Sequence, residues 1–163
     1  MDKEHMPETD AAHYELAFHV LPTVAEGEVA EVFTALKALV EKAGGEVTSE
    51  ETPKRFDLAY EVVKYLEGRN RKFSSAYFGW VRFTLQPAKL AEIMESVEGN
   101  SKLLRHLLIR LNKMEEANPF MFHESLTKEQ AAIEEDVEEN EDEEVDDTDI
   151  DAIDGKDGEE EVK

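Results

Sequence analysis

Residues 14–20 read YELAFHV. Every second residue of this stretch is large and apolar, which is the period-two pattern of a β-strand with one buried face. Immediately downstream, TVAE at residues 23–26 fits a capping box. Apolar residues then recur every three or four positions until Gly44-Gly45, at Val29, Val32, Phe33, Leu36, Leu39, Val40 and Ala43. The stretch therefore predicts a strand followed by a helix that buries a wide apolar stripe.

The next two segments predict a pair of strands. Residues 46–51 and 56–65 suit one long strand that is interrupted near Thr52-Pro53. Proline cannot donate a hydrogen bond to a central ladder, so this strand is expected at an edge of the sheet. Residues 73–85 are rich in aromatic and β-branched residues and predict the third strand.

The remaining core segments predict a helix and a last strand. Pro87 suits a first helical position, and Gly99 ends the apolar periodicity that follows it. In the last strand, residues 103–111, we expect one set of side chains to face inward (Leu107, Ile109 and Leu111) and another to face the opposite way (His106 and Arg110). The order β-α-β-β-α-β predicts an α+β fold, the ferredoxin-like (split β-α-β) sandwich, with a four-stranded antiparallel sheet, two helices on one face and the other face open.

The charge divides the chain into parts. The 163 residues contain 18 Lys plus Arg and 40 Asp plus Glu, a net charge of −22. Residues 12–114 carry fourteen of each sign, whereas residues 115–163 carry three basic and 22 acidic residues. We predict a flexible head at 1–11, one core domain at 12–114, a linker at 115–139 with room for a short helix capped at Thr127, and a disordered acidic tail at 140–163. Such a chain is unsuited to binding nucleic acid over its whole surface.

The sequence lacks the residues or the spacing that several kinds of catalytic and metal sites require. There is no cysteine for a disulfide, a thiolate or a Cys-type zinc site. The five histidines form no i, i+4 pair, and the acidic run from Asp149 to Gly155 misses the register of a calcium loop. No phosphate-binding loop, nucleophile elbow or placed carboxylate pair is present, so we expect no enzyme activity, metal or cofactor. No apolar run is as long as a membrane span, and Met1-Asp2-Lys3-Glu4 is not typical of a signal peptide, so a cytoplasmic location is expected.

The basic residues of the core are concentrated between residues 54 and 82, where seven bases accompany three acids. Residues 68–72 are interpreted as an exposed hairpin tip, and flexible cations at such a tip suit RNA phosphates. The candidate RNA-binding residues are Lys54, Arg55, Lys64, Arg69, Arg71, Lys72 and Arg82. The alternative is an ordinary solvated loop.

Alternation along residues 73–85 predicts an aromatic row on the open face. If Val81 and Phe83 face the helices, then Phe78, Trp80 and Arg82 face the other way. An exposed row of this kind suits stacking with an RNA base or packing against a protein, and we assign that role to Phe78, Trp80 and Arg110. The alternative is that neighbouring strands and the tail cover Trp80.

The core resembles a known family over about residues 14–112. The shared features are Tyr14-Glu15-Leu16, Lys54-Arg55, Leu58-Ala59-Tyr60 with Lys64, Tyr77-Phe78 with Trp80, Pro87 and Asn100. In this order they resemble the bacterial small-subunit ribosomal protein S6 family. The resemblance implies a structural constituent of the cytoplasmic ribosome that binds small-subunit ribosomal RNA together with ribosomal protein S18, with no membrane and no small-molecule substrate. The chain departs from the family at Glu61, where proline is usual, and at residues 65–75, which look longer than the corresponding hairpin connection of the family.

Other functions on the same fold stay open. Residues 78–83, FGWVRF, are close to the second half of the RNA-recognition-motif signature, which would make the domain a reader of single-stranded RNA. Against this, the signature begins with a base and a glycine where this chain has Ala76 and Tyr77. A non-ribosomal protein-interaction domain and a small-ligand-binding regulatory domain are the remaining alternatives.

Overall fold

The computed structural model describes residues 10–142, and side chains through residue 133. The chain divides into two compact units, Met1–Met121 and Phe122–Lys163. The predicted head at 1–11 lies almost wholly outside the described residues, as does the predicted tail beyond residue 142. The acidic run from Asp149 to Gly155 lies outside them too.

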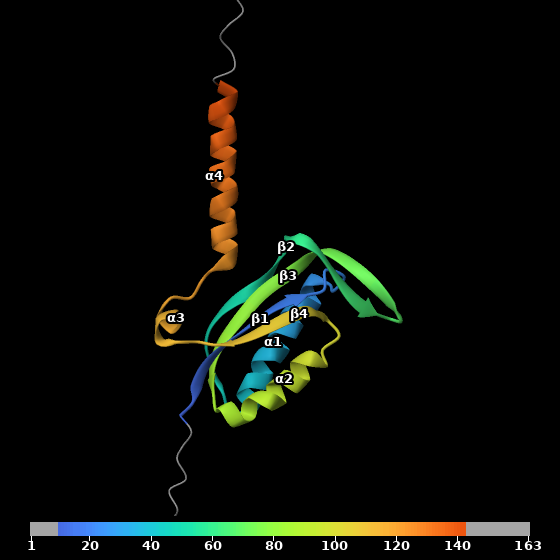
Figure 1. Ribbon diagram of the computed structural model, residues 1–163, viewed down its shortest axis with the longest axis vertical. Coiled ribbons are helices and arrows are strands. Elements are labelled where there is room, and N and C mark those ends of the chain that lie inside the picture. The colour runs from blue at the N-terminus through green and yellow to red at the C-terminus, as the bar shows by residue number, and fades with distance from the viewer. Residues whose placement is uncertain (1–9, 143–163) are drawn as a thin grey trace, which may run out of the picture. The chain divides into compact units, whose positions relative to one another are not determined.

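The first unit is a sheet covered by helices on one face (Figure 1). Its elements are β1 (Ala12–Val20), α1 (Glu26–Lys42), β2 (Glu46–Leu66), β3 (Arg69–Leu85), the 3₁₀ turn η1 (Pro87–Lys89), α2 (Leu90–Glu98), β4 (Leu103–Arg110) and α3 (Lys113–Ala117). The strands pair in the order β2-β3-β1-β4, and every pairing is antiparallel. This arrangement confirms the predicted ferredoxin-like sandwich.

The core lies between the sheet and helices α1 and α2. Leu16, Val81 and Phe83 are each fully buried, and they pack in one cluster with apolar residues of both helices. The alternation predicted for β1 is confirmed, because Ala12, Tyr14, Leu16, Phe18 and Val20 are all buried. The predicted capping box is wrong: α1 begins at Glu26, and its N-cap residue Ala25 has no side chain that could cap the helix.

Strand β2 is a single edge strand whose pairing with β3 shifts register at three places, and one of these lies at Pro53, where the sequence predicted an interruption. The shifts fall between Val47 and Ser49, between Glu51 and Lys54, and between Asp57 and Val62. Gly79 of β3 lies against the shift at Pro53: a Cβ atom there would stand 2.8 Å from the Glu51 carbonyl oxygen and 2.9 Å from Pro53 Cγ. The close approach of the two backbones therefore requires glycine at this position.

The connection between β2 and β3 is a two-residue turn, Glu67-Gly68, with φ of 51° and 81°. These positive angles are typical of a type I′ hairpin turn. The predicted hairpin is confirmed and Gly68 lies in its turn, but the loop predicted at residues 68–72 and the long connection at 65–75 are wrong, because Arg69–Lys72 belong to β3. Residues 69–72 are polar or charged, and in a sequence such a run is typical of a loop. In the structure these residues pair with β2 in an antiparallel ladder.

The outer part of this hairpin is a two-stranded arm. Strand β3 pairs with β1 only from Tyr77 onward, so the preceding residues pair with β2 alone. We call residues 57–76 the hairpin arm; its outer end projects past β1 and β4 (Figure 1). A second apolar cluster supports it, in which Phe73 and Ala76 pack with Leu21, Leu104, Leu58, Val62 and Leu66.

The facing of β4 differs from the prediction. Leu107 is 61% exposed and Ile109 is 39% exposed, whereas Leu108 packs against the core. The pairing with β1 shifts register between His19 and Val20, and both Leu103 and Leu104 are buried at that point. This irregularity sets the phase of the strand, so only Leu111 of the three predicted inward residues is buried.

The second unit contains α4 (Phe122–Asp142). The helix is longer than the short one predicted at 115–139, and it includes the first residues of the predicted tail. Thr127 lies inside it and its hydroxyl donates to the His123 carbonyl oxygen at 2.9 Å, so Thr127 is not a cap. Within residues 10–142, no helix has the length and hydropathy of a transmembrane segment.

Candidate nucleic-acid interface

The structure brings four of the predicted basic residues together on the hairpin arm. Lys64 lies directly opposite Arg71, Leu66 opposite Arg69, and Val63 opposite Lys72. Directly opposed side chains share a face of the ladder, so Lys64 and Arg71 are neighbours while Lys72 points to the other side. Lys54 and Arg55 are exposed on β2 near the base of the arm.

The ion pairs of the arm are long and exposed. Arg71 Nη1 lies 3.9 Å from Glu67 Oε2, and Lys72 Nζ lies 3.8 Å from Glu61 Oε2. Exposed pairs of this kind are worth about 0–1 kcal/mol, so a phosphate can displace them at little cost. Arg71 is also positioned by the ring of Phe73, 5.6 Å from its guanidinium carbon.

Lys64 has an internal role in addition. Its Nζ donates to the carbonyl oxygen of Leu103, which ties the arm to the start of β4. Burial lowers the pKa of Lys64 below its usual value, because the charged form loses solvation. Of the four cations on the arm, Lys64 thus contributes most to holding the arm against the rest of the sheet.

Arg82 and Trp80 lie on the open face, as alternation predicted, but both are buried at 6% and 3% exposure. Arg82 Nε lies 2.7 Å from Glu15 Oε2, and Nη1 donates to the Glu115 carbonyl oxygen at 2.6 Å. Trp80 Nε1 donates to Glu51 Oε2 at 2.7 Å. The predicted exposure of these two side chains is therefore wrong, and the alternative that Trp80 is covered is confirmed.

The predicted grouping of Phe78 with Arg110 is also wrong. Phe78 is half-buried and lies opposite His19. Arg110 lies opposite Tyr14, a buried residue of the helix-covered face. Opposed residues share a face, so Arg110 is exposed at the sheet edge on the side away from Phe78.

A cluster that the sequence did not reveal occupies the open face near the arm. Arg105 Nε donates to His19 Nδ1 and Nη1 donates to the Tyr60 hydroxyl, both at 3.1 Å. The His19 ring centroid lies 5.1 Å from that of Phe78 and 5.7 Å from that of Phe56. Burial, with a smaller contribution from Arg105, lowers the pKa of His19 to about 4, so the imidazole is neutral at pH 7.

A hollow of about 380 Å³ adjoins this cluster and is lined by Ala17, His19, Phe78, Arg105, His106 and Leu107. In the sequence, the only sign of this hollow was that Arg105 and Leu107 are two residues apart, so that in a strand they share a face. It could be used only once the phase of β4 was known.

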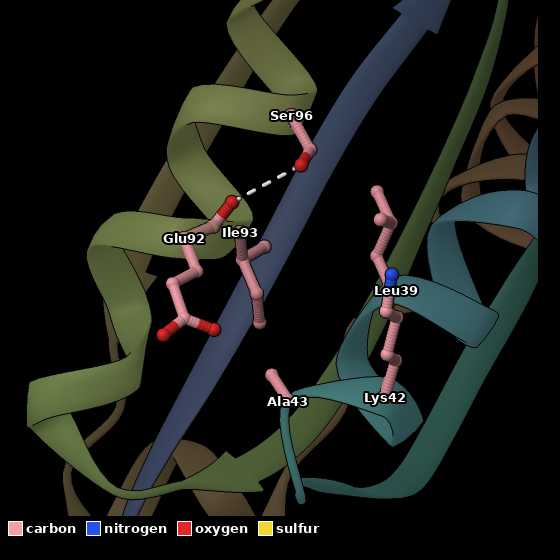
Figure 2. Close-up of a pocket in the computed structure, with 6 residues that line it drawn as sticks. All are labelled: Leu39, Lys42, Ala43, Glu92, Ile93 and Ser96. Atoms are coloured by element: carbon pink, nitrogen blue, oxygen red, sulfur yellow. Dashed lines mark hydrogen bonds between the residues drawn. The ribbon is translucent and has the colours of Figure 1, made fainter.

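A smaller hollow of about 180 Å³ lies between α1 and α2 (Figure 2). Ile93 and Leu39 form apolar walls, and Ser96 Oγ donates to the Glu92 carbonyl oxygen one turn earlier in α2 at 3.1 Å. This is an ordinary groove between packed helices. Within the described part of the chain, no group of three or more His, Asp and Glu side chains is placed to hold a metal ion.

Comparisons with known proteins agree with the fold and add a family. The sequence profile described as Ribosomal protein S6 matches residues 13–110. The Small ribosomal subunit protein bS6 of Desulforamulus reducens is 31% identical over 98 residues, which are 60% of this chain and 95% of the relative. That of Leptothrix cholodnii is 30% identical over 119 residues, 73% of this chain and 90% of the relative.

A solved structure gives independent support for the fold. The crystal structure of 30S ribosomal protein S6 from Thermotoga maritima superposes with a TM-score of 0.57 at 20% identity, covering 66% of this chain and 94% of that one. The profile match alone spans more than half of the chain. The chain therefore belongs to the ribosomal protein S6 family and is a protein of the small ribosomal subunit, as its sequence predicted.

Proposed function

We propose that this protein is a structural constituent that binds small-subunit ribosomal RNA through its hairpin arm, together with ribosomal protein S18. The observation that carries the proposal is the charge of this region. Residues 54–72 hold six basic and three acidic residues in a chain whose net charge is −22. Cations on a projecting two-stranded arm can reach the phosphates of a folded RNA.

The candidate basic residues differ in how accessible they are to RNA. Lys54, Arg55, Arg69 and Lys72 are exposed, and Arg71 is half-exposed beside a weak ion pair; these five are proposed to contact phosphates. Lys64 supports them by anchoring the arm. Arg82 is left out of the interface because its guanidinium is buried against Glu15 and the Glu115 carbonyl group. The family resemblance supplies S18 as the protein partner.

Burial of Trp80 and Arg82 weighs against the alternative of an RNA-recognition-motif reader. Such a reader uses the aromatic residues of its central strands as exposed platforms for bases. In this chain the indole of Trp80 is instead held by Glu51 within the sheet. Electrostatic binding by the arm is therefore the better-supported mechanism.

The test compares two triple variants of equal charge change. Arg69→Ala/Arg71→Ala/Lys72→Ala removes cations of the arm, and Lys89→Ala/Lys102→Ala/Lys113→Ala removes exposed cations elsewhere. Affinity for a fragment of small-subunit ribosomal RNA is measured with S18 present at several salt concentrations. We expect the arm variant to bind at least about tenfold more weakly, with a salt slope reduced by about 3, since each lost phosphate contact removes about 0.9.

The control variant should bind within about twofold of the wild type, because none of its three lysines belongs to the arm. Equal losses in the two variants would show that only overall charge matters and would contradict the proposed site. Repeating the titration without S18 measures how much of the affinity depends on the partner.

A further inference from the structure

The hollow on the open face has the composition of a small binding pocket. Ala17 provides a small side chain, Phe78 and Leu107 provide apolar surface, and Arg105 supplies a cation. Its volume of about 380 Å³ lies within the range of ligand pockets, about 300–1,000 Å³. Leu107, at 61% exposure, is among the large apolar residues that β4 leaves open.

Arg105 is held in place rather than left to move freely. Its two hydrogen bonds, to His19 and Tyr60, fix the guanidinium plane, and the Tyr60 ring lies 5.6 Å from its central carbon. An arginine has five N–H donors and these two bonds engage two of them, so donors remain to bind an anion. Ordering this long side chain in advance lowers the entropy lost when a ligand binds.

The surrounding surface is aromatic and uncharged. With a pKa of about 4, His19 is a neutral ring at physiological pH, and it contacts Phe56 and Phe78. An uncharged aromatic wall beside one fixed guanidinium is the combination that binds a nucleotide of a single strand. The base stacks on the π-surface and the cation meets the phosphate.

The position of the hollow relates it to the arm. Tyr60, which holds Arg105, is itself a residue of the hairpin arm. The hydrogen bond between Arg105 and Tyr60 therefore joins the arm to the hollow.

We propose that this hollow binds one unpaired nucleobase of the ribosomal RNA, with Arg105 holding an adjacent phosphate. The proposal rests on the proposed function and assigns a second contact to it, beyond the phosphates of the arm. A protein side chain in the same hollow would gain from Phe78 and Leu107, but it would need a carboxylate or carbonyl group in addition to use the donors of Arg105.

The first measurement compares two single strands of equal charge on the full-length protein at low salt. One is an unstructured ten-nucleotide RNA, and the other carries abasic ribose at its central positions. We expect the intact strand to bind at least about fivefold more tightly, the lower end of what one stacked base contributes. Equal affinities for the two strands would overturn the proposal.

Two pairs of variants on β4 then locate the site. Arg105→Gln removes the proposed phosphate contact and should lower the affinity for the intact strand more than Arg110→Gln, the same change on the other face. Leu107→Ser should weaken the preference, whereas Ile109→Ser, which changes a neighbour outside the hollow, should not. All four side chains are exposed, and thermal unfolding checks that each variant stays folded.

Other outcomes count against the hollow specifically. If Arg105→Gln and Arg110→Gln lower RNA affinity equally, the effect is one of general charge and the base site is refuted. If Leu107→Ser weakens binding of S18 while leaving the preference for the intact strand unchanged, the hollow is a protein site and the proposal fails. Loss of ribosomal RNA binding in the arm variant alone would leave the proposed function standing while the base site falls.

Discussion

The two faces of the sheet are built from alternate residues of the same strands, yet they are held together differently. The helix-covered face is apolar, and Leu16, Val81 and Phe83 are fully buried there. On the open face the side chains are paired by polar contacts, such as Arg82 with Glu15 and Arg105 with His19. Apolar burial supplies most of the stability of a fold, whereas polar pairs mainly fix side chains in position. The open face is therefore the one prepared for recognition.

The largest expected effect comes from opening a cavity on the helix-covered face. Phe83→Ala removes a fully buried ring and should lower the free energy of unfolding by about 3–5 kcal/mol. Phe78→Ala makes the same change at a half-buried position of the same strand and should cost about half as much or less. Urea denaturation measures both, and equal losses would show that the two faces contribute alike.

A smaller effect is expected from breaking the polar pair of the open face. Arg82→Met leaves the Glu15 carboxylate and the Glu115 carbonyl group without their donor, and should lower the free energy of unfolding by about 2–4 kcal/mol. Adding Glu15→Gln should recover part of this loss, because an uncompensated charge no longer remains. Strict additivity of the two single changes in a double-mutant cycle would contradict the coupling.

The smallest effect concerns pH. The pKa of His19 falls from 6.5 to about 4 on folding, so between these values the unfolded chain binds a proton that the folded chain does not. The free energy of unfolding should therefore decrease as the pH falls from 6.5 to about 4, and should level off at lower pH. Because His19 is partly exposed to solvent, the expected decrease is on the order of 1 kcal/mol. His19→Gln should flatten this part of the pH profile, and His106→Gln, which leaves His19 in place, should not.

The sequence predicted the fold because its strongest patterns act locally. Alternation in β1, the proline at the edge strand and the glycine after α2 each correspond to one structural feature. The phase of β4 could not be predicted in this way, since leucines occur at both parities and a register shift decides between them. The hairpin turn was missed because Glu67 at positive φ is not the usual Asn-Gly or Asp-Gly signal.

The candidate site was harder to predict than the fold. Alternation placed Trp80 and Arg82 on the correct face, but their exposure depends on Glu51 and Glu15, which come from other strands. The Arg105 cluster joins residues of β1, β2 and β4 that lie far apart in the chain. Only the pairing of the strands brings such residues together.

The interruption at Thr52-Pro53 has a consequence for molecules that have not yet joined a ribosome. An edge strand of 21 residues offers a long row of unsatisfied backbone groups, on which a second copy could grow a continuous sheet. The missing amide of Pro53 and the shifted register beside it divide that row into shorter pieces. These breaks hinder pairing between the edge strands of newly made copies, and with it the growth of fibrous aggregates.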